Sequence, residues 1–274
     1  MSKYSVNPRK KMGQSFLKSE KVARSIADAA MIAPTDSILE IGGGLGILTL
    51  WLARSAKKVT VVELDKGLVK ALKNNLSDFE NVEVIQGDAL KIPLPDTDKI
   101  VSNLPYSISS EITFKFLKDV KFDLAVLMFQ KEFAQRLLAV PESSVYSRLS
   151  IDFQYLGTAE YVRDVKAGNF YPVPSVDSTI LKITKRSTGP VAKNPDVFFW
   201  MINGLYSYPN KQLKKALKIW FKRLGYPNAT DIFLSKIGDL DPTLRLRALP
   251  LESLTVMADI VQSMIEDGDL PTMG

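Results

Sequence analysis

The chain has 274 residues, 46% of them hydrophobic, which is enough for one large domain or for a core domain with an appendage, and we expect the second. It contains no cysteine and no histidine, which excludes disulfides, thiolate nucleophiles, cysteine-type zinc sites and imidazole bases. The formal net charge of +6 favours an anionic partner, with nucleic acid the leading candidate. The sequence has no apolar run suited to a transmembrane helix or a signal peptide, so we expect a soluble cytosolic protein.

The charge is distributed unevenly along the chain. One basic cluster lies at residues 9–11, and residues 197–230 hold several cations and no acidic residue: Lys211, Lys214, Lys215, Lys218, Lys222 and Arg223. After Arg247 every charged side chain is acidic. The segment 211–223 predicts either a phosphate-binding helix face or a solvated lysine-rich face above a core stripe, and both interpretations stay open.

Apolar runs of strand length alternate with stretches of helical periodicity in the first half of the chain. These runs are residues 37–41, 59–64, 82–86, 99–103 and 123–129. The alternation is typical of βαβ units and predicts a mostly parallel sheet that is buried on both faces. A later run at 178–184 predicts a strand that completes the sheet, and a Gly/Pro/Asn-bearing linker at 187–195 separates it from a helical remainder. We expect an α/β domain over residues 1–186 and a smaller all-helical domain over residues 187–274.

A glycine-rich turn follows the first predicted strand. Gly42, Gly44 and Gly46 alternate in a segment that opens directly into a predicted helix. Glycines let the backbone turn sharply and approach a ligand, and the helix N-terminus adds a positive end. The spacing differs from the G-x-G-x-x-G of dinucleotide-binding turns, and Glu40 stands two residues before the first glycine. By itself the turn fits a ligand site and a ligand-free turn about equally well.

Two acidic residues end the next two predicted strands. Glu63 closes the second strand, where a carboxylate can accept both hydroxyl protons of a ribose, and Asp88 follows the third, where it can accept from an adenine amino group. Each alone could equally be a strand-end capping acid. Because the carboxyl ends of parallel strands meet in one crevice, the three features together predict a site for an adenosine derivative. Glu40 and Glu63 favour positive charge there, so a sulfonium fits better than a pyrophosphate.

The tetrapeptide Asn103-Leu104-Pro105-Tyr106 follows the fourth predicted strand. Proline fixes its own φ and restricts the preceding residue to an extended conformation, so this loop is stiff. A helix-entry turn, with Ser107 or Ser109 as the N-cap, would account for the proline and the serines. It would not account for an asparagine and a tyrosine beside an adenosine site.

Four segments in order carry a family resemblance: E-I-G-G-G-L-G, V-V-E-L-D, Q-G-D-A-L and N-L-P-Y-S-I-S. With them the chain resembles the class I methyltransferases that use S-adenosylmethionine, and specifically the small-subunit ribosomal RNA adenine N6,N6-dimethyltransferases. Residues 13–17, 130–132, 146–150 and 170–178 extend the match. The resemblance implies a Rossmann-like α/β sheet and, as substrate, small-subunit ribosomal RNA in a pre-assembled or partly assembled subunit. We also expect a monomer without a metal site.

The resemblance also implies roles for individual residues. The implied cofactor-binding residues are Ser15, Leu17, Gly42, Gly44, Glu63, Asp88 and Asn103. The implied catalytic residues are Asn103, Leu104, Pro105 and Tyr106, and Tyr106 and Phe170 would flank the target adenine. The family usually has asparagine or histidine at position 15, and the arginine pair that the resemblance implies ahead of the lysine is missing from Tyr208-Pro209-Asn210-Lys211.

The chemistry implied by the resemblance does not need a strong base. If the Asn103 side-chain oxygen and the Leu104 carbonyl accept the hydrogens of the adenine amine, its lone pair is freed toward the methyl donor. The amine becomes acidic only after methylation and can then lose a proton to water. Two alternatives remain, a large-subunit ribosomal RNA adenine methyltransferase of the antibiotic-resistance type and an assembly factor that has kept the fold with little turnover.

Overall fold

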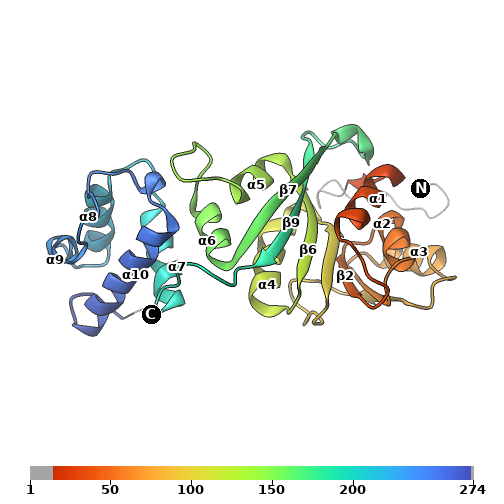
Figure 1. The fold of residues 1–274 in the computed structure, drawn as a ribbon, viewed down its shortest axis with the longest axis horizontal. Coiled ribbons are helices and arrows are strands. Elements are labelled where there is room, and N and C mark those ends of the chain that lie inside the picture. Colours follow the sequence, from red (N-terminus) through yellow and green to blue (C-terminus); the bar gives the residue numbers. More distant parts are fainter. Residues whose placement is uncertain (1–14, 273–274) are drawn as a thin grey trace. The chain divides into compact units, whose positions relative to one another are not determined.

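The computed structural model describes residues 15–272, which form two compact units (Figure 1). The described part of the first unit comprises residues 15–134 and 157–185, and that of the second comprises residues 135–156 and 186–272. The basic cluster at residues 9–11 and the motif residues Gly13 and Gln14 lie outside the described residues. The sequence prediction had not assigned residues 135–156 to the second unit.

The first unit is built on a seven-stranded sheet with the order β4-β3-β2-β5-β6-β9-β7. Its strands are β2 (Ser37–Ile41), β3 (Lys58–Glu63), β4 (Val82–Gln86), β5 (Lys99–Asn103), β6 (Leu124–Gln130), β7 (Gly157–Val165) and β9 (Ser178–Lys185). The first five strands in this order pair in parallel, whereas β9 is antiparallel to both β6 and β7. The predicted parallel sheet and its late additional strand are confirmed, and β7 is an edge strand that the sequence did not assign.

Short helices connect the strands of the first unit. They are α1 (Glu20–Ala29), α2 (Ile47–Ala53), α3 (Lys66–Asn75), η3 (Tyr106–Ile108), α4 (Ser109–Asp119), η4 (Ala167–Asn169) and the start of α5 (Lys131–Leu137). Because helices link the parallel strands, the central strands are apolar on both faces, and Val59, Val61 and Val101 are fully buried. A separate two-stranded sheet pairs β1 (Phe16–Leu17) with β8 (Phe170–Tyr171).

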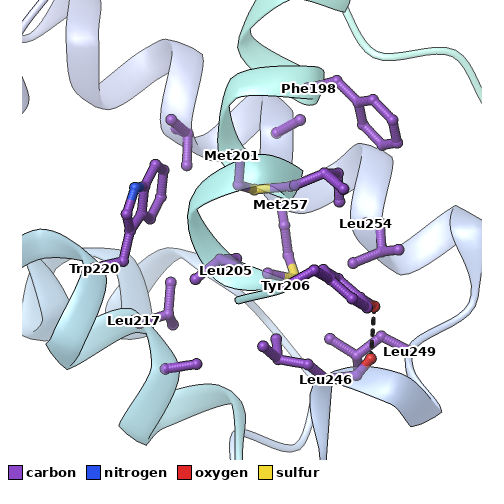
Figure 2. Close-up of a cluster of buried hydrophobic side chains, with 14 of the residues drawn as sticks. Phe198, Met201, Leu205, Tyr206, Leu217, Trp220, Leu246, Leu249, Leu254 and Met257 are labelled. Carbon is purple, nitrogen blue, oxygen red and sulfur yellow. Dashed lines mark hydrogen bonds between the residues drawn. The ribbon is translucent and has the colours of Figure 1, made fainter. Parts of the chain in front are cut away.

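The second unit has an all-helical core. It contains α6 (Arg148–Leu156), α7 (Pro195–Leu205), α8 (Leu213–Arg223), α9 (Ala229–Lys236), η5 (Leu246–Ala248) and α10 (Leu251–Glu266). Figure 2 shows Met201, Trp220 and Met257 in this core and the Tyr206 hydroxyl, which donates to the Leu246 carbonyl at 2.6 Å. Within residues 15–272, no helix has the length and apolar character needed to cross a bilayer.

An aromatic contact explains why residues 135–156 belong to the second unit. The Tyr155 ring of α6 stacks on Phe198 of α7 with ring centroids 4.1 Å apart. The Tyr155 hydroxyl also accepts a hydrogen bond from the Ala192 amide at 3.3 Å. This packing joins α6 to the helical core across a long separation in sequence, and such pairing cannot be read from local periodicity.

Candidate active site

A cavity of about 340 Å³ lies at the carboxyl ends of β2, β3, β4 and β5 in the first unit. The predicted site residues that line it are Ser15, Leu17, Gly42, Gly44, Glu63, Asp88, Asn103, Leu104, Pro105 and Tyr106. The structure therefore brings together every predicted site residue except Phe170. Among the residues that the structure describes, the lining contains no lysine and no arginine.

The glycine turn forms one wall of the cavity because side chains are excluded there. Gly42 and Gly44 have φ values of +75° and +58°, which L-residues other than glycine rarely adopt. A Cβ on Gly42 would lie 3.0 Å from the Pro105 ring, and one on Gly44 would lie 3.2 Å from the Phe16 ring. The turn thus packs on the loop after β5 at Gly42 and on β1 at Gly44, and a side chain at either position would crowd these neighbours.

Glu63 is held by backbone donors at the end of β3. Its Oε2 accepts from the Gly44 amide at 3.2 Å, and its Oε1 accepts from the Asp65 amide at 3.0 Å. The residue is 5% exposed, and burial raises the pKa of the carboxyl while these amide donors oppose the rise. Each carboxylate oxygen has a second lone pair, so Glu63 can still accept hydroxyl protons from a ligand.

Glu40 is a cavity residue to which the sequence gave no individual binding role. It is 2% exposed, lines the cavity, and its Oε2 has no hydrogen-bond partner among the described residues. Burial raises its pKa to about 8; the nearby Thr49 hydroxyl opposes this rise and the negative charge of Glu63 adds to it. A buried carboxyl with a free oxygen is costly, and a cationic or hydrogen-donating ligand would lower that cost. The acidic residue before the glycines was the signal in the sequence.

Asp88 lies two residues after β4, makes a capping hydrogen bond and also lines the cavity. Its Oδ1 accepts from the Leu90 amide at 3.0 Å, which is a local turn-capping bond. Lys91 lies 3.7 Å from its Oδ2, but the lysine side chain is 82% exposed, so this ion pair is weak. The carboxylate nevertheless lines the cavity and keeps acceptor capacity for a ligand.

Asn103 and Leu104 place polar backbone and side-chain atoms at the end of β5. The Asn103 Oδ1 is buried and has no hydrogen-bond partner among the described residues. Leu104 is 1% exposed, which anchors its backbone between the strand and the following proline. An unsatisfied amide oxygen at a cavity wall is the kind of acceptor that a ligand amine can satisfy.

The helix after this loop begins differently from the prediction. The N-cap of α4 is Ile108, with no side-chain capping bond, so the predicted serine N-cap is wrong. A short 3₁₀ turn, η3, precedes α4 instead, and the Ser109 hydroxyl donates to the Pro105 carbonyl at 3.2 Å. The 3₁₀ turn can absorb the helix entry because its tighter hydrogen bonds satisfy the first backbone groups without a side-chain cap.

Tyr106 and Phe170, the two aromatic residues assigned to the substrate, differ in their surroundings. Tyr106 lines the cavity, and its hydroxyl lies 2.7 Å from the Ser178 Oγ. Burial raises the pKa of Tyr106, and the hydrogen bond to Ser178 opposes the rise. Phe170 is fully buried among apolar residues that include Leu17, outside the cavity lining. Its contact with a substrate stays a prediction and requires the ring to become exposed.

The described residues contain no group of three or more aspartate, glutamate, histidine or cysteine side chains placed to hold a metal ion. The cavity lining offers acceptor oxygens and aromatic surface. Three carboxyls, one free amide oxygen and a tyrosine ring meet in one pocket. Such a pocket can bind a cationic adenosine derivative and hold a planar amine-bearing ring against it.

The chain is similar in sequence to known proteins over most of its length. A family model described as ribosomal RNA adenine dimethylase matches residues 5–262. The chain is 42% identical to a probable ribosomal RNA small subunit methyltransferase A of Methanosarcina mazei, over 90% of this chain and 91% of that protein. It is 43% identical to a protein with the same description from Methanococcus maripaludis, over 93% of this chain and 98% of that one.

Two solved structures are similar along almost the whole chain. A dimethyladenosine transferase from Plasmodium falciparum has a TM-score of 0.80 and 30% identity, covering 92% of this chain and 98% of that one. The 23S rRNA methyltransferase ErmE has a TM-score of 0.66 and 27% identity, covering 90% and 99%. Both likenesses extend the comparison from sequence to three-dimensional structure, and the small-subunit relatives are the more similar in sequence.

Proposed function

The chain belongs to the ribosomal RNA adenine dimethylase family, and we propose that it transfers methyl groups from S-adenosylmethionine to the N6 of adenosines in small-subunit ribosomal RNA. The product is N6,N6-dimethyladenosine, formed during ribosome biogenesis. The observation that carries this proposal is the cavity at the carboxyl ends of four parallel strands, where Glu63, Asp88 and Asn103 meet the glycine turn.

The charge of the cavity and its glycine turn support S-adenosylmethionine as the ligand. Glu40, Glu63 and Asp88 give its lining three carboxyls and no opposing lysine or arginine among the described residues, which suits a cation. The free Oε2 of Glu40 is an acceptor that a positively charged ligand group would satisfy. The glycines with positive φ leave the turn without side chains, so a ligand can lie against its backbone. When bound, this cofactor supplies a methyl group on a sulfonium, which an amine nitrogen can attack.

Asn103 and Leu104 would make the adenine amine a better nucleophile. The lone pair of this amine is delocalised into the ring, and two acceptors that hold its hydrogens draw the nitrogen toward tetrahedral geometry. The Asn103 Oδ1 is free for this role, and the Leu104 carbonyl would be the second acceptor. This is positioning combined with electrostatic preorganisation, so neither histidine nor cysteine is needed.

Tyr106 would hold the plane of the target base. Base-aromatic stacking contributes about 1–3 kcal/mol per base in single-stranded sites. A looped adenosine can be extracted from its stack at lower cost than a paired one, which favours RNA loops as substrates. For the second transfer the monomethylated amine must return with its remaining hydrogen, so the pocket must also accommodate the first methyl group.

The second unit offers a cationic surface for the ribosomal RNA. The cations on and just before α8 are exposed and make no ion pair within the described residues: Lys211, Lys214, Lys215, Lys218, Lys222 and Arg223. The opposite face of the helix is buried through Leu213, Leu217 and Trp220. Unpaired cations on one helix face are suited to phosphates, so we propose that this α8 face contacts RNA of a pre-assembled or partly assembled small subunit. The enzyme would act there as a monomer.

Labelled-methyl transfer to undermethylated small subunits, followed by nucleoside analysis, tests the proposal. We expect N6,N6-dimethyladenosine as the labelled product. Monomethyladenosine alone, or no label, would overturn it. A parallel reaction with large-subunit RNA tests the alternative suggested by the likeness to ErmE, and binding to small subunits without transfer would indicate an assembly factor with little turnover.

A further inference from the structure

The hydroxyl of Tyr106 forms a hydrogen bond with Ser178, which lies 72 positions later in the chain. It lies 2.7 Å from the Ser178 Oγ, and either oxygen can be the donor. Ser178 itself has no exposed surface, whereas Tyr106 reaches the cavity wall. The contact therefore runs from the core of the first unit to the ring proposed to stack on the target base.

Ser178 occupies a rigid position. It is the first residue of β9 and pairs on one side with Gln130 of β6 and on the other with Val165 of β7. Its two neighbours are fixed as well. Asp177 accepts from the Ala167 amide at 3.0 Å, and the Thr179 hydroxyl donates to Asp164 at 2.7 Å. The Ser178 side chain therefore has little freedom to move together with Tyr106.

We propose that Ser178 is a positioning residue, whose hydroxyl fixes the ring of Tyr106 at the cavity wall in the orientation needed to hold the substrate base. The inference rests on the proposed function of the cavity. Tyr106 is the first residue of the short η3 turn, which has no side-chain cap of its own. Without this hydrogen bond the ring could rotate about its side-chain torsions. A misplaced ring would lower the fraction of correctly oriented substrate and so slow methyl transfer.

The geometry makes the two hydroxyls interdependent. Removing one partner leaves the other as a buried hydroxyl without its hydrogen bond, which is unfavourable, whereas removing both is nearly neutral. Tyr106→Phe should therefore retain the ring but leave the buried Ser178 hydroxyl without its hydrogen-bond partner. The double variant Tyr106→Phe/Ser178→Ala should recover the stability that Tyr106→Phe loses.

A double-mutant cycle on methyl transfer tests the role. Ser178→Ala should lower kcat about tenfold, the factor that corresponds to ~1.4 kcal/mol of lost hydrogen bonding, with a small change in KM for S-adenosylmethionine. In the Tyr106→Phe background the same substitution should have no further effect on kcat. Equal losses in both backgrounds, or no loss in the wild-type background, would refute the positioning role.

Thr179→Ala is the matched control, because Thr179 is the adjacent buried hydroxyl on the same strand and hydrogen-bonds Asp164 instead of Tyr106. Its effect on kcat should be the same in the wild-type background and in the Tyr106→Phe background. If Thr179→Ala and Tyr106→Phe were coupled in kcat as strongly as Ser178→Ala and Tyr106→Phe, then β9 would act through general stability. That result would overturn the proposal.

A readout that needs no enzymatic activity separates this inference from the proposed function. In protein labelled at the tyrosine ζ carbons, Tyr106→Phe assigns the Tyr106 resonance. Ser178→Ala should shift this resonance and Thr179→Ala should leave it in place. An unchanged Tyr106 resonance in Ser178→Ala contradicts the hydrogen bond between Tyr106 and Ser178, even if the wild type is active. If the resonance shifts but the protein transfers no methyl group, the proposed function is refuted and the hydrogen bond between Tyr106 and Ser178 is supported.

Discussion

The cavity of the first unit and the α8 face of the second unit have opposite electrostatics. The cavity lining holds Glu40, Glu63 and Asp88 and, among the described residues, no cationic side chain. The α8 face has several exposed cations, and no acidic residue occurs between positions 197 and 230. A net charge of +6 conceals this separation. One basic chain thus combines an acidic pocket, which suits the proposed cationic methyl donor, with a basic surface that suits the proposed RNA.

The largest effect is expected where the cavity chemistry is concentrated. Asn103→Ala removes the free acceptor oxygen at the end of β5, and methyl transfer should fall by at least about 10²-fold, as when one preorganised hydrogen-bond group is removed from an active site. Affinity for S-adenosylmethionine, measured by calorimetry, should change little because Glu63 and Asp88 remain. Turnover near that of the wild type would rule out the role of Asn103 in activating the amine.

Tyr106 distinguishes ring stacking from hydroxyl chemistry. Tyr106→Phe keeps the ring and should lose only the about tenfold expected for the hydrogen bond to Ser178. Tyr106→Ala also removes the ring and should lower kcat/KM for RNA by about a further 5- to 150-fold, which corresponds to the ~1–3 kcal/mol of base stacking. Steady-state kinetics on undermethylated subunits measures both. Equal losses in the two variants would contradict stacking.

Much of this site could be predicted because it is encoded locally. The glycine turn, the acidic strand ends and Asn103-Leu104-Pro105-Tyr106 each follow an apolar run, and parallel strands bring such ends to one edge. β7 could not be predicted in the same way, since it is an edge strand with mostly partly or fully exposed side chains and no buried apolar run. The bond between Tyr106 and Ser178 depends on strands paired far apart in sequence, and local periodicity carries no signal for it.

A smaller effect is expected on the cationic side of the comparison. The variant K214Q/K215Q/K218Q removes three exposed charges from α8, and its RNA affinity should depend less steeply on salt, by roughly 0.7 in the logarithmic slope for each phosphate that is no longer neutralised. Binding titrations at several salt concentrations measure this slope. The matched control K66Q/K70Q/K73Q removes three exposed charges from α3. A control slope that falls as far would mean that net charge, and not the α8 face, governs binding.

The effect expected at Glu40 is a dependence of stability on pH. Its folded-state pKa is raised to about 8 from an ordinary value of 4.5, so the stability associated with its burial is fully present below about pH 4.5 and is lost as pH rises through about 8. Between these limits the free energy of unfolding should fall by at most about 1.4 kcal/mol per pH unit relative to Glu40→Gln. Denaturant unfolding from pH 5 to pH 8 measures the difference, and parallel curves for the two proteins would contradict a raised pKa.

The same carboxyl links the pH dependence to the ligand. A cation in the cavity favours the ionised form of Glu40, so affinity for S-adenosylmethionine should rise with pH up to about 8 in the wild type and rise less in Glu40→Gln. The slope left in Glu40→Gln would come from Glu63, whose pKa burial also raises. S-adenosylhomocysteine, a neutral thioether of nearly the same shape, is the matched ligand, and its affinity should depend less on pH. An equal dependence for both ligands would mean that the cavity carboxyls do not sense the sulfonium charge.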